Sequence, residues 1–495
     1  MDYVVFDLVI VIALLQYTNI QSSNGVISDQ LKIAFEKEKI TDVMVTFKHR
    51  PSEILSKISL QTKSVTDRGE KLRILSDELE ILAKSSQINI LKKLKEKNVG
   101  SRIRSLWITN QVSIGGASLD LVTSIAALPE VLKIDKIYSF KLEPDQDIQK
   151  KDDVHVEPPN NKMAYNDTIS DKEITQASVY SWAVWKIQAP EVWEMGYDGQ
   201  GVVVGIIDSG ISLTHDVVYD SFIGTDEYGW FDPNKMGEVP RDITGHGTVC
   251  LGHMTGKYGM GVAPSAKWMA CNCVDDGWRY REDWVLECFQ FMLCPTDHMG
   301  NNKNCSRAPR VISNSYNTVP GESGEFFREI TKVLVETDIH YVFSIGNFGS
   351  FCNSTGSPGN FEEFIGVGLT TIYDEYQTLS SAGPDPTGKL IKPDICAPAD
   401  MVMSAHYEFG NDFIDIATGT SLSTPIVGGV IALMVQKNSK LSQKDVKKIL
   451  FNSTTLAVID EPKICGDTPD DQIPNNRIGW GVVNALKAIL NVPEP

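Results

Sequence analysis

The chain has 495 residues, of which 42% are hydrophobic and 38 are glycine, so it can bury a large core and fold as two or more domains. Its formal net charge of -18 argues against a nucleic-acid partner, because a phosphate-binding protein needs a basic face. The acidity otherwise indicates only a soluble protein that repels anions.

The N-terminus holds a short apolar stretch at 8–15, which is too short to span a bilayer, so no transmembrane helix is expected there. We predict a secretory signal peptide over 1–23 and therefore a secreted, extracellular protein. Asp2 and Asp7 depart from the usual signal pattern, which has Lys or Arg at its start. Secretion also fits four Asn-X-Ser/Thr glycosylation sites, which start at Asn166, Asn304, Asn353 and Asn452.

None of the nine cysteines precedes Cys250. In a secreted protein this pattern predicts disulfide bonds in the second half of the chain, with at least one thiol left over because nine is odd, unless chains pair. Buried reduced cysteine is the alternative for any single one of them. The pair at 271–273 has no matching His cluster at zinc-site spacing, so no metal site is predicted.

The first part of the chain after residue 40 has the order strand, helix, strand, strand, helix, strand. Residues 41–48 alternate like a strand, and leucines at helical spacing within 66–97 predict an amphipathic helix. A bent strand or strand pair follows at 105–116, and then a helix and a last strand that reaches residue 140. This order predicts a small ferredoxin-like α+β domain of the split βαβ type.

Residues 141–180 are rich in Pro, Asp, Lys and Asn and lack an apolar period, which is typical of an exposed, easily cut linker. Lys150–Lys151 could be a cutting site, although plain surface charge is the favoured interpretation. From residue 190, short apolar runs such as "GVVVGIID" and "HYVFSIGN" alternate with helical patterns. These runs predict strands buried on both faces, and hence an α/β domain with a mostly parallel sheet.

Asp208 ends one of these predicted strands, where catalytic groups gather in open α/β sheets. His246 lies between two glycines in "GHGT", and Asn347 ends a strand in "SIGNFG". Each residue also has a common structural explanation: a helix cap for Asp208, a structural or solvated histidine, and a turn for the asparagine.

Ser421 lies in "TGTSLSTPIVGG", and on its own it could simply start a helix. Together the four residues predict a mechanism in which Ser421 is the nucleophile, His246 its base and Asp208 the group that holds the imidazole. Asn347 and the Ser421 backbone N–H would donate to the oxyanion. Pro425 is expected in the first turn of the helix.

The blocks "VVVGIIDSG", "GHGT", "SIGNFG" and "GTSLSTP" resemble the Asp, His, Asn and Ser motifs of the subtilisin-like serine proteases. "GVAPSAKWMACNCVDD" and "RIGWGVVNALKAI" are similar to the bacillopeptidase F-like branch, and residues 105–135 resemble the inhibitory propeptide of these proteases. The resemblance implies a propeptide over 24–140, a linker with the processing site over 141–180, and a three-layer αβα subtilisin-like domain over 181–495.

The resemblance also implies a secreted serine endopeptidase made as a self-processing zymogen, whose propeptide is a chaperone and temporary inhibitor. It would act on proteins or peptides as a monomer, with no cofactor needed for catalysis. Structural calcium could bind, but the acidic loops, such as 225–242, show no assignable ligand pattern. The substrate would pair as an added strand, and the implied substrate-binding residues are Ser315, Tyr316, Asn317, Gly346 and Phe348.

The sequence departs from the family pattern next to this site. Asn317 stands where glycine is usual, which would narrow the approach of the substrate, and Phe348 predicts an unusual primary pocket. Leu422 replaces a methionine of similar volume, so little effect is expected. Cys250, four residues after His246, is expected to be the unpaired thiol, as in some relatives.

Two other functions are compatible with these motifs. A catalytically inactive relative could bind peptides, but the intact set of four residues argues against it. An esterase or other acyl transferase could use the same triad, but it would be expected to have a G-x-S-x-G nucleophile elbow, whereas Ser421 lies in "GTSLS".

Overall fold

The computed structural model describes residues 25–97, 102–141, 146–147, 181–235, 237–322, 324–408 and 411–495. Two compact units are present: unit 1 comprises the described residues up to Ser139 with Arg281–Gln290, and unit 2 comprises those of Phe140–Tyr280 and Phe291–Pro495. The predicted signal peptide and most of the predicted linker lie outside the described residues. The predicted domain boundaries stay predictions.

Unit 1 contains a four-stranded sheet of order β2-β3-β1-β4, in which every neighbouring pair is antiparallel. This is the predicted ferredoxin-like order. The stretch at 105–116 contributes to two strands, and two further helices, α2 and α3, were not foreseen. The elements are α2 (Asp29–Lys37), β1 (Ile40–Phe47), α3 (Leu55–Thr62), α4 (Arg68–Glu96), β2 (Ile103–Leu106), β3 (Gln111–Ser118), α5 (Leu119–Ala126) and β4 (Val131–Lys136).

Helix α4 shows why this part of the sequence folds as it does. Asp67 caps it by accepting a hydrogen bond from the backbone N–H of Glu70 at 2.7 Å. Leu72, Leu75 and Leu79 recur at helical spacing and are buried, so the helix covers apolar surface along one face.

Unit 2 is built on a seven-stranded sheet of order β14-β13-β12-β11-β7-β9-β8, and the neighbouring strands pair in parallel. β12 and β13 are buried at every position, as predicted for apolar runs without alternation. The strands are β7 (Val203–Asp208), β8 (Trp230–Phe231), β9 (Lys267–Asn272), β11 (Val311–Asn314), β12 (His340–Ser344), β13 (Ile365–Thr370) and β14 (Ile395–Pro398).

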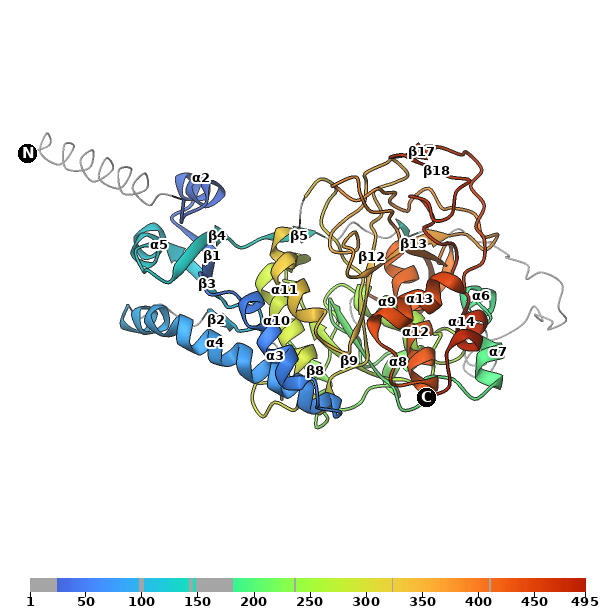
Figure 1. The fold of residues 1–495 in the computed structure, drawn as a ribbon, viewed down its shortest axis with the longest axis horizontal. Coiled ribbons are helices and arrows are strands. Elements are labelled where there is room, and N and C mark those ends of the chain that lie inside the picture. The colour runs from blue at the N-terminus through green and yellow to red at the C-terminus, as the bar shows by residue number, and fades with distance from the viewer. Residues whose placement is uncertain are drawn as a thin grey trace, which may run out of the picture. The chain divides into compact units, whose positions relative to one another are not determined.

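Helices cover both faces of this sheet. Figure 1 shows α9, α12, α13 and α14 on one side of the strands and α11 on the other. A hairpin of β15 and β16 precedes α12, and β6 pairs with β16 in antiparallel fashion. These elements are β6 (Gln146–Asp147), α9 (His246–Thr255), α11 (Glu325–Leu334), β15 (Val402–Glu408), β16 (Asn411–Thr418), α12 (Thr420–Lys437), α13 (Gln443–Asn452) and α14 (Ala485–Asn491).

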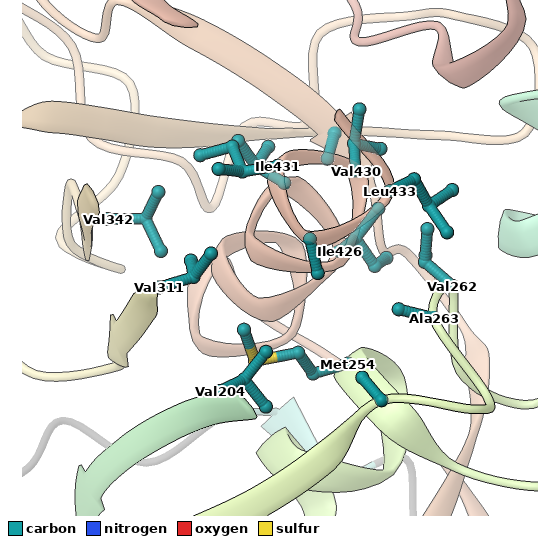
Figure 2. Packing of buried hydrophobic residues seen from close by; sticks show 14 of the residues in the cluster. Val204, Met254, Val262, Ala263, Val311, Val342, Ile426, Val430, Ile431 and Leu433 are labelled. Carbon is teal, nitrogen blue, oxygen red and sulfur yellow. The ribbon is translucent and has the colours of Figure 1, made fainter. Parts of the chain in front are cut away.

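Helix α12 is the centre of the core. It is apolar on all sides and buried from Thr420 to Val435, which is typical of a helix enclosed by other elements. A Cβ added to Gly429 would lie 2.6 Å from the Val262 Cβ, so glycine is needed for this close approach. Figure 2 shows its side chains packing against strands and against α9, with Val204, Met254, Val262, Ala263, Val311, Val342, Ile426, Val430, Ile431 and Leu433 labelled.

The cysteines confirm the expected disulfides in the second half of the chain. Cys294–Cys305 and Cys352–Cys465 are bonded, and Cys271 and Cys288 are also disulfide-bonded. Cys250 is not disulfide-bonded, as expected, and neither are Cys273 and Cys396; all three are buried. Within the described ranges, no helix has both the length and the apolar character needed to cross a membrane.

Candidate active site

Asp208 and His246 form a direct pair. Asp208 is fully buried at the end of β7, and His246 is the first residue of α9 and is partly buried. His246 Nδ1 lies 2.8 Å from Asp208 Oδ1. The residue before the helix, Gly245, has φ +88, and an added Cβ would meet the Tyr407 carbonyl oxygen at 2.0 Å. Glycine is therefore required where the chain turns into α9.

A second buried carboxylate, Asp242, holds the loops that carry this pair. It accepts hydrogen bonds from Ser209 Oγ at 2.7 Å, from the Gly245 N–H at 2.8 Å, and from both the N–H and the hydroxyl of Thr248. Burial raises the pKa of the Asp242 carboxyl, although these hydrogen bonds act in the opposite direction. The carboxylate thus joins the residue after Asp208 to both ends of the first turn of α9.

Ser421 is the second residue of α12, where backbone N–H groups lack partners within the helix. Its side chain is almost fully buried, and its hydroxyl donates to the Ser315 carbonyl oxygen at 3.4 Å. Pro425 lies inside the helix and not in its first turn, so that expectation was wrong. The helix begins earlier than the proline suggested, because Thr420 already follows the Gly419 cap.

The position of Pro425 inside the helix explains why the Ser421 carbonyl oxygen accepts hydrogen bonds from other segments of the chain. Pro425 has no N–H to donate to the carbonyl four residues before it. Instead, Ser315 Oγ donates to the Ser421 oxygen at 2.8 Å, and Cys250 Sγ donates to it at 3.4 Å. Cys250 Sγ also lies 3.7 Å and 3.8 Å from the two ring nitrogens of His246. One thiol therefore contacts both the ring of His246 and the backbone of Ser421, while His246 pairs with Asp208.

Asn347 lies beside Ser421, three residues beyond the end of β12. Its side-chain oxygen accepts from the backbone N–H of Thr420 at 2.9 Å and from the Thr420 hydroxyl at 2.8 Å. Because the amide oxygen is fixed by the residue next to the nucleophile, the amide nitrogen is the end that can donate to a reacting oxygen.

The geometry on this edge of unit 2 can be set beside known proteins. A family model described as Subtilase family, peptidase S8, matches residues 199–481, more than half of the chain. The chain belongs to the subtilase family. Together with the seven-stranded parallel sheet, this confirms the predicted fold and the predicted resemblance.

Individual proteins that are similar to this subtilase agree with the family assignment. Bacillopeptidase F of Bacillus subtilis (strain 168) is 30% identical over 96% of this chain and 33% of its own length. Serine protease AprX of the same organism is 28% identical over 54% of this chain and 64% of its own length. Neuroendocrine convertase 2 of Sus scrofa is 26% identical over 60% of this chain and 48% of its own length. The subtilase thus spans about a third of the length of bacillopeptidase F.

The residues that the resemblance implies for substrate binding differ in their contacts and burial. Ser315 contacts Ser421, as described. The Tyr316 side chain is fully buried and its hydroxyl donates to Asn314 Oδ1 at 3.0 Å, so its ring points into the core. Gly346 has φ +116, and an added Cβ would lie 2.8 Å from the Phe348 ring.

Asn317 fills space that a glycine would leave open. Its Nδ2 donates to Ser344 Oγ at 2.9 Å, and a Cβ added to Gly356 would lie 2.7 Å from the Asn317 Cβ. That Asn317 narrows the approach of the substrate stays a prediction.

Sequence reasoning missed two residues of the site. Asp242 precedes His246 by four residues, and a carboxylate at that spacing before the "GHGT" motif is a signal that could have been used. Tyr280, whose hydroxyl lies 3.1 Å from Asp208 Oδ1, is 72 positions away and gave no local signal. In the part of the chain that the structure describes, one cluster has ligand atoms close enough for a metal ion, and it consists of Asp208, His246 and Cys250.

Proposed function

We propose that this subtilase is a secreted serine endopeptidase with Asp208, His246 and Ser421 as its catalytic triad and Asn347 in its oxyanion hole. The observation that carries the proposal is the 2.8 Å contact between Asp208 Oδ1 and His246 Nδ1, together with the Cys250 thiol that contacts both the His246 ring and the Ser421 carbonyl. The membership in the subtilase family supports the same chemistry.

The reaction begins when Ser421 Oγ attacks the carbonyl carbon of the scissile peptide bond and His246 accepts the hydroxyl proton at Nε2. Asp208 holds the Nδ1–H of the ring and stabilises the imidazolium that forms. The substrate carbonyl becomes an oxyanion, which the Asn347 amide and the Ser421 backbone N–H stabilise. His246 then gives the proton to the leaving amine. A water molecule, deprotonated by His246, hydrolyses the acyl ester and restores Ser421.

The substrate of this reaction would be a protein or peptide that pairs as an added strand along the segment after β11. Its backbone would lie on Ser315, Tyr316 and Asn317, and its side chain would reach Gly346 and Phe348. The buried ring of Tyr316 leaves the backbone of that residue as its contact with the substrate.

The front of the chain, over 24–140, would be a propeptide that inhibits the enzyme until self-cleavage. Two observations within unit 2 support this idea. The Phe140 ring stacks on Tyr280, which donates to Asp208, and Gln146 pairs with Thr418, three residues before Ser421. Phe140 and Gln146 therefore both contact close neighbours of the triad residues.

Several further properties belong to the same proposal. The signal peptide over 1–23 would direct secretion, and the enzyme would act as a monomer without a cofactor for catalysis. Glycans would attach at the Asn-X-Ser/Thr sites. Calcium, if bound, would have a structural role.

Expression of the full chain tests the proposal. The wild type should release a fragment of the predicted propeptide size and hydrolyse peptides, whereas Ser421→Ala should stay full-length and lose hydrolysis by about a million-fold. Ser423→Ala is the matched control, because this serine lies in the same buried turn and its hydroxyl donates to the Thr420 carbonyl. It should behave as the wild type.

Two outcomes would oppose the proposal. A folded wild type that binds peptides without cutting them would indicate a catalytically inactive relative. Hydrolysis of esters without hydrolysis of peptides would indicate an esterase.

A further inference from the structure

Tyr280, in β10 (Arg279–Arg281), links the triad to an aromatic cluster. Its side chain is 1% exposed, and its hydroxyl lies 3.1 Å from Asp208 Oδ1. On the ring side, Phe140 stacks at 5.3 Å between centroids with an interplanar angle of 12°, and Tyr316 packs at 4.9 Å. Phe140 belongs to the predicted propeptide and leaves on processing, whereas Tyr316 stays against the ring of Tyr280 in the mature enzyme.

The hydroxyl is the donor in this contact. Burial, together with the nearby charge of Asp208, raises the pKa of the Tyr280 phenol well above its usual value, so the O–H stays intact. Asp208 Oδ1 also accepts from the Ser209 N–H at 2.7 Å and lies 2.8 Å from His246 Nδ1. Among the described residues, the second oxygen, Oδ2, is buried and has no hydrogen-bond partner. Three hydrogen bonds thus converge on the oxygen that faces the imidazole.

We propose that Tyr280 is a positioning residue for the hydrolysis, because its O–H fixes the Asp208 oxygen that orients His246 and reduces the negative charge that this oxygen presents to the ring. The inference rests on the proposed function and adds a role for one hydroxyl.

The physical consequence concerns the protonation of His246. A donor to the carboxylate oxygen competes for its lone pairs, so Asp208 stabilises the imidazolium of His246 less than it would without this O–H. Without the O–H, the carboxylate favours the imidazolium more strongly, and its own orientation is less fixed. Removal of the hydroxyl should therefore slow catalysis and make His246 take up a proton at higher pH.

Other titratable groups face this pair from the neighbouring elements. Cys250 approaches His246 from α9, and Cys273 follows β9 beside Asp208, where burial raises the pKa of the Cys273 thiol. Asp242 acts through Ser209. None of these groups is changed when only the Tyr280 hydroxyl is removed.

The test is Tyr280→Phe, which keeps the ring and removes only the hydroxyl. We expect kcat to fall about tenfold with little change in KM, and the acid limb of the kcat/KM profile to move about half a pH unit upward. Tyr341→Phe is the control, because this buried tyrosine hydroxyl bonds Thr337 Oγ1 at 3.0 Å in β12. Its pH profile and kcat should match the wild type.

A second measurement works without activity. The ring of His246 is titrated by NMR in three full-length chains that all carry Ser421→Ala. The first keeps Tyr280, the second carries Tyr280→Phe and the third carries Tyr280→3-fluorotyrosine. The fluorinated phenol is more acidic and therefore a stronger hydrogen-bond donor. The pH midpoint of the His246 titration should thus be lower with 3-fluorotyrosine, and higher with Phe, than with Tyr280. Should Tyr280→Phe fail to fold, the fluorinated variant still gives a direction.

Equal midpoints in all three chains, or an unchanged kcat and acid limb in an active Tyr280→Phe enzyme, would overturn the role of Tyr280. A wild type that shows no hydrolysis would instead overturn the proposed function. The NMR titration would then still decide whether the hydroxyl acts on His246.

Discussion

At the scale of single residues, the peptide that carries the nucleophile is held from outside its own helix. Pro425 cannot donate to the Ser421 carbonyl, so Ser315 and Cys250 do so from two other elements. The hydroxyl is the stronger donor of the two, since a thiol forms weak hydrogen bonds. The position of Ser421 therefore depends on side chains brought together only by the tertiary fold.

Ser315→Ala should remove the stronger of these two side-chain donors to the buried Ser421 carbonyl. We expect a loss of about 1–2 kcal/mol in the free energy of unfolding, measured by urea denaturation in the Ser421→Ala background to prevent self-digestion. Ser313→Ala is the control, because among the described residues the buried Ser313 hydroxyl has no partner. It should be neutral or stabilising, and equal losses for both variants would contradict the assigned role of Ser315.

Asn317 should restrict the substrate residue on the acyl side of the scissile bond to small side chains. Its side chain occupies the space beside Gly356 and is held by Ser344. Asn317→Gly should raise kcat/KM for large residues relative to alanine at that position by about 10- to 100-fold, measured with a matched peptide series. An unchanged ranking would show that the pocket lies elsewhere.

At the scale of elements, the start of α10 (Glu282–Leu293) is held by polar contacts within unit 1. The backbone of Glu282 donates to the Tyr138 carbonyl at 3.0 Å, and its carboxylate accepts from the Tyr138 N–H at 3.1 Å. Arg104 pairs with Glu287 at 2.8 Å. The predicted propeptide and the segment 281–290 thus fold as one compact unit.

Unit 1 should lose stability as the pH rises. Burial, with the charges of Asp283 and Asp135, raises the pKa of Glu282 to about 8 from 4.5. Between these values the folded unit binds one proton more than the unfolded chain, so stability falls by at most about 1.4 kcal/mol per pH unit. The contribution of Glu282 to the stability of unit 1 is therefore fully present below about pH 4.5 and lost above about pH 8.

Melting temperatures of the Ser421→Ala precursor across this range check the prediction. Glu282→Gln, whose side chain stays neutral, should flatten the pH dependence of the melting temperature. Glu336→Gln, at an exposed position, should leave this pH dependence unchanged. Parallel curves for the precursor and Glu282→Gln would show that another group is responsible.

The mature enzyme should begin between Lys141 and Gln146, at the front of the predicted linker. Phe140 packs on Tyr280, and Gln146 pairs with Thr418, three residues before Ser421, so we expect cleavage between these two contacts. N-terminal sequencing of the processed protein gives the answer. A first cut near Lys150–Lys151 in protein made without other proteases would contradict this arrangement.

At the scale of the whole molecule, the sequence predicted what depends on local pattern. Apolar runs without alternation identified the parallel strands, and the short motifs gave Asp208, His246, Asn347 and Ser421 as candidates for the site. It could not predict Tyr280, because the contact with Asp208 joins residues 72 positions apart. Pro425 was misplaced because proline usually marks a first turn, and here tertiary contacts compensate for it.

The most direct test of the central claim is the identity of the nucleophile. The processed wild-type protein is treated with a fluorophosphonate, digested, and analysed by tandem mass spectrometry. We expect a single adduct on Ser421, absent when His246→Ala removes the base and retained in His253→Ala, whose buried ring lies on the same helix and contacts Ser404. An adduct on any other residue, or none on a folded chain, would contradict the account.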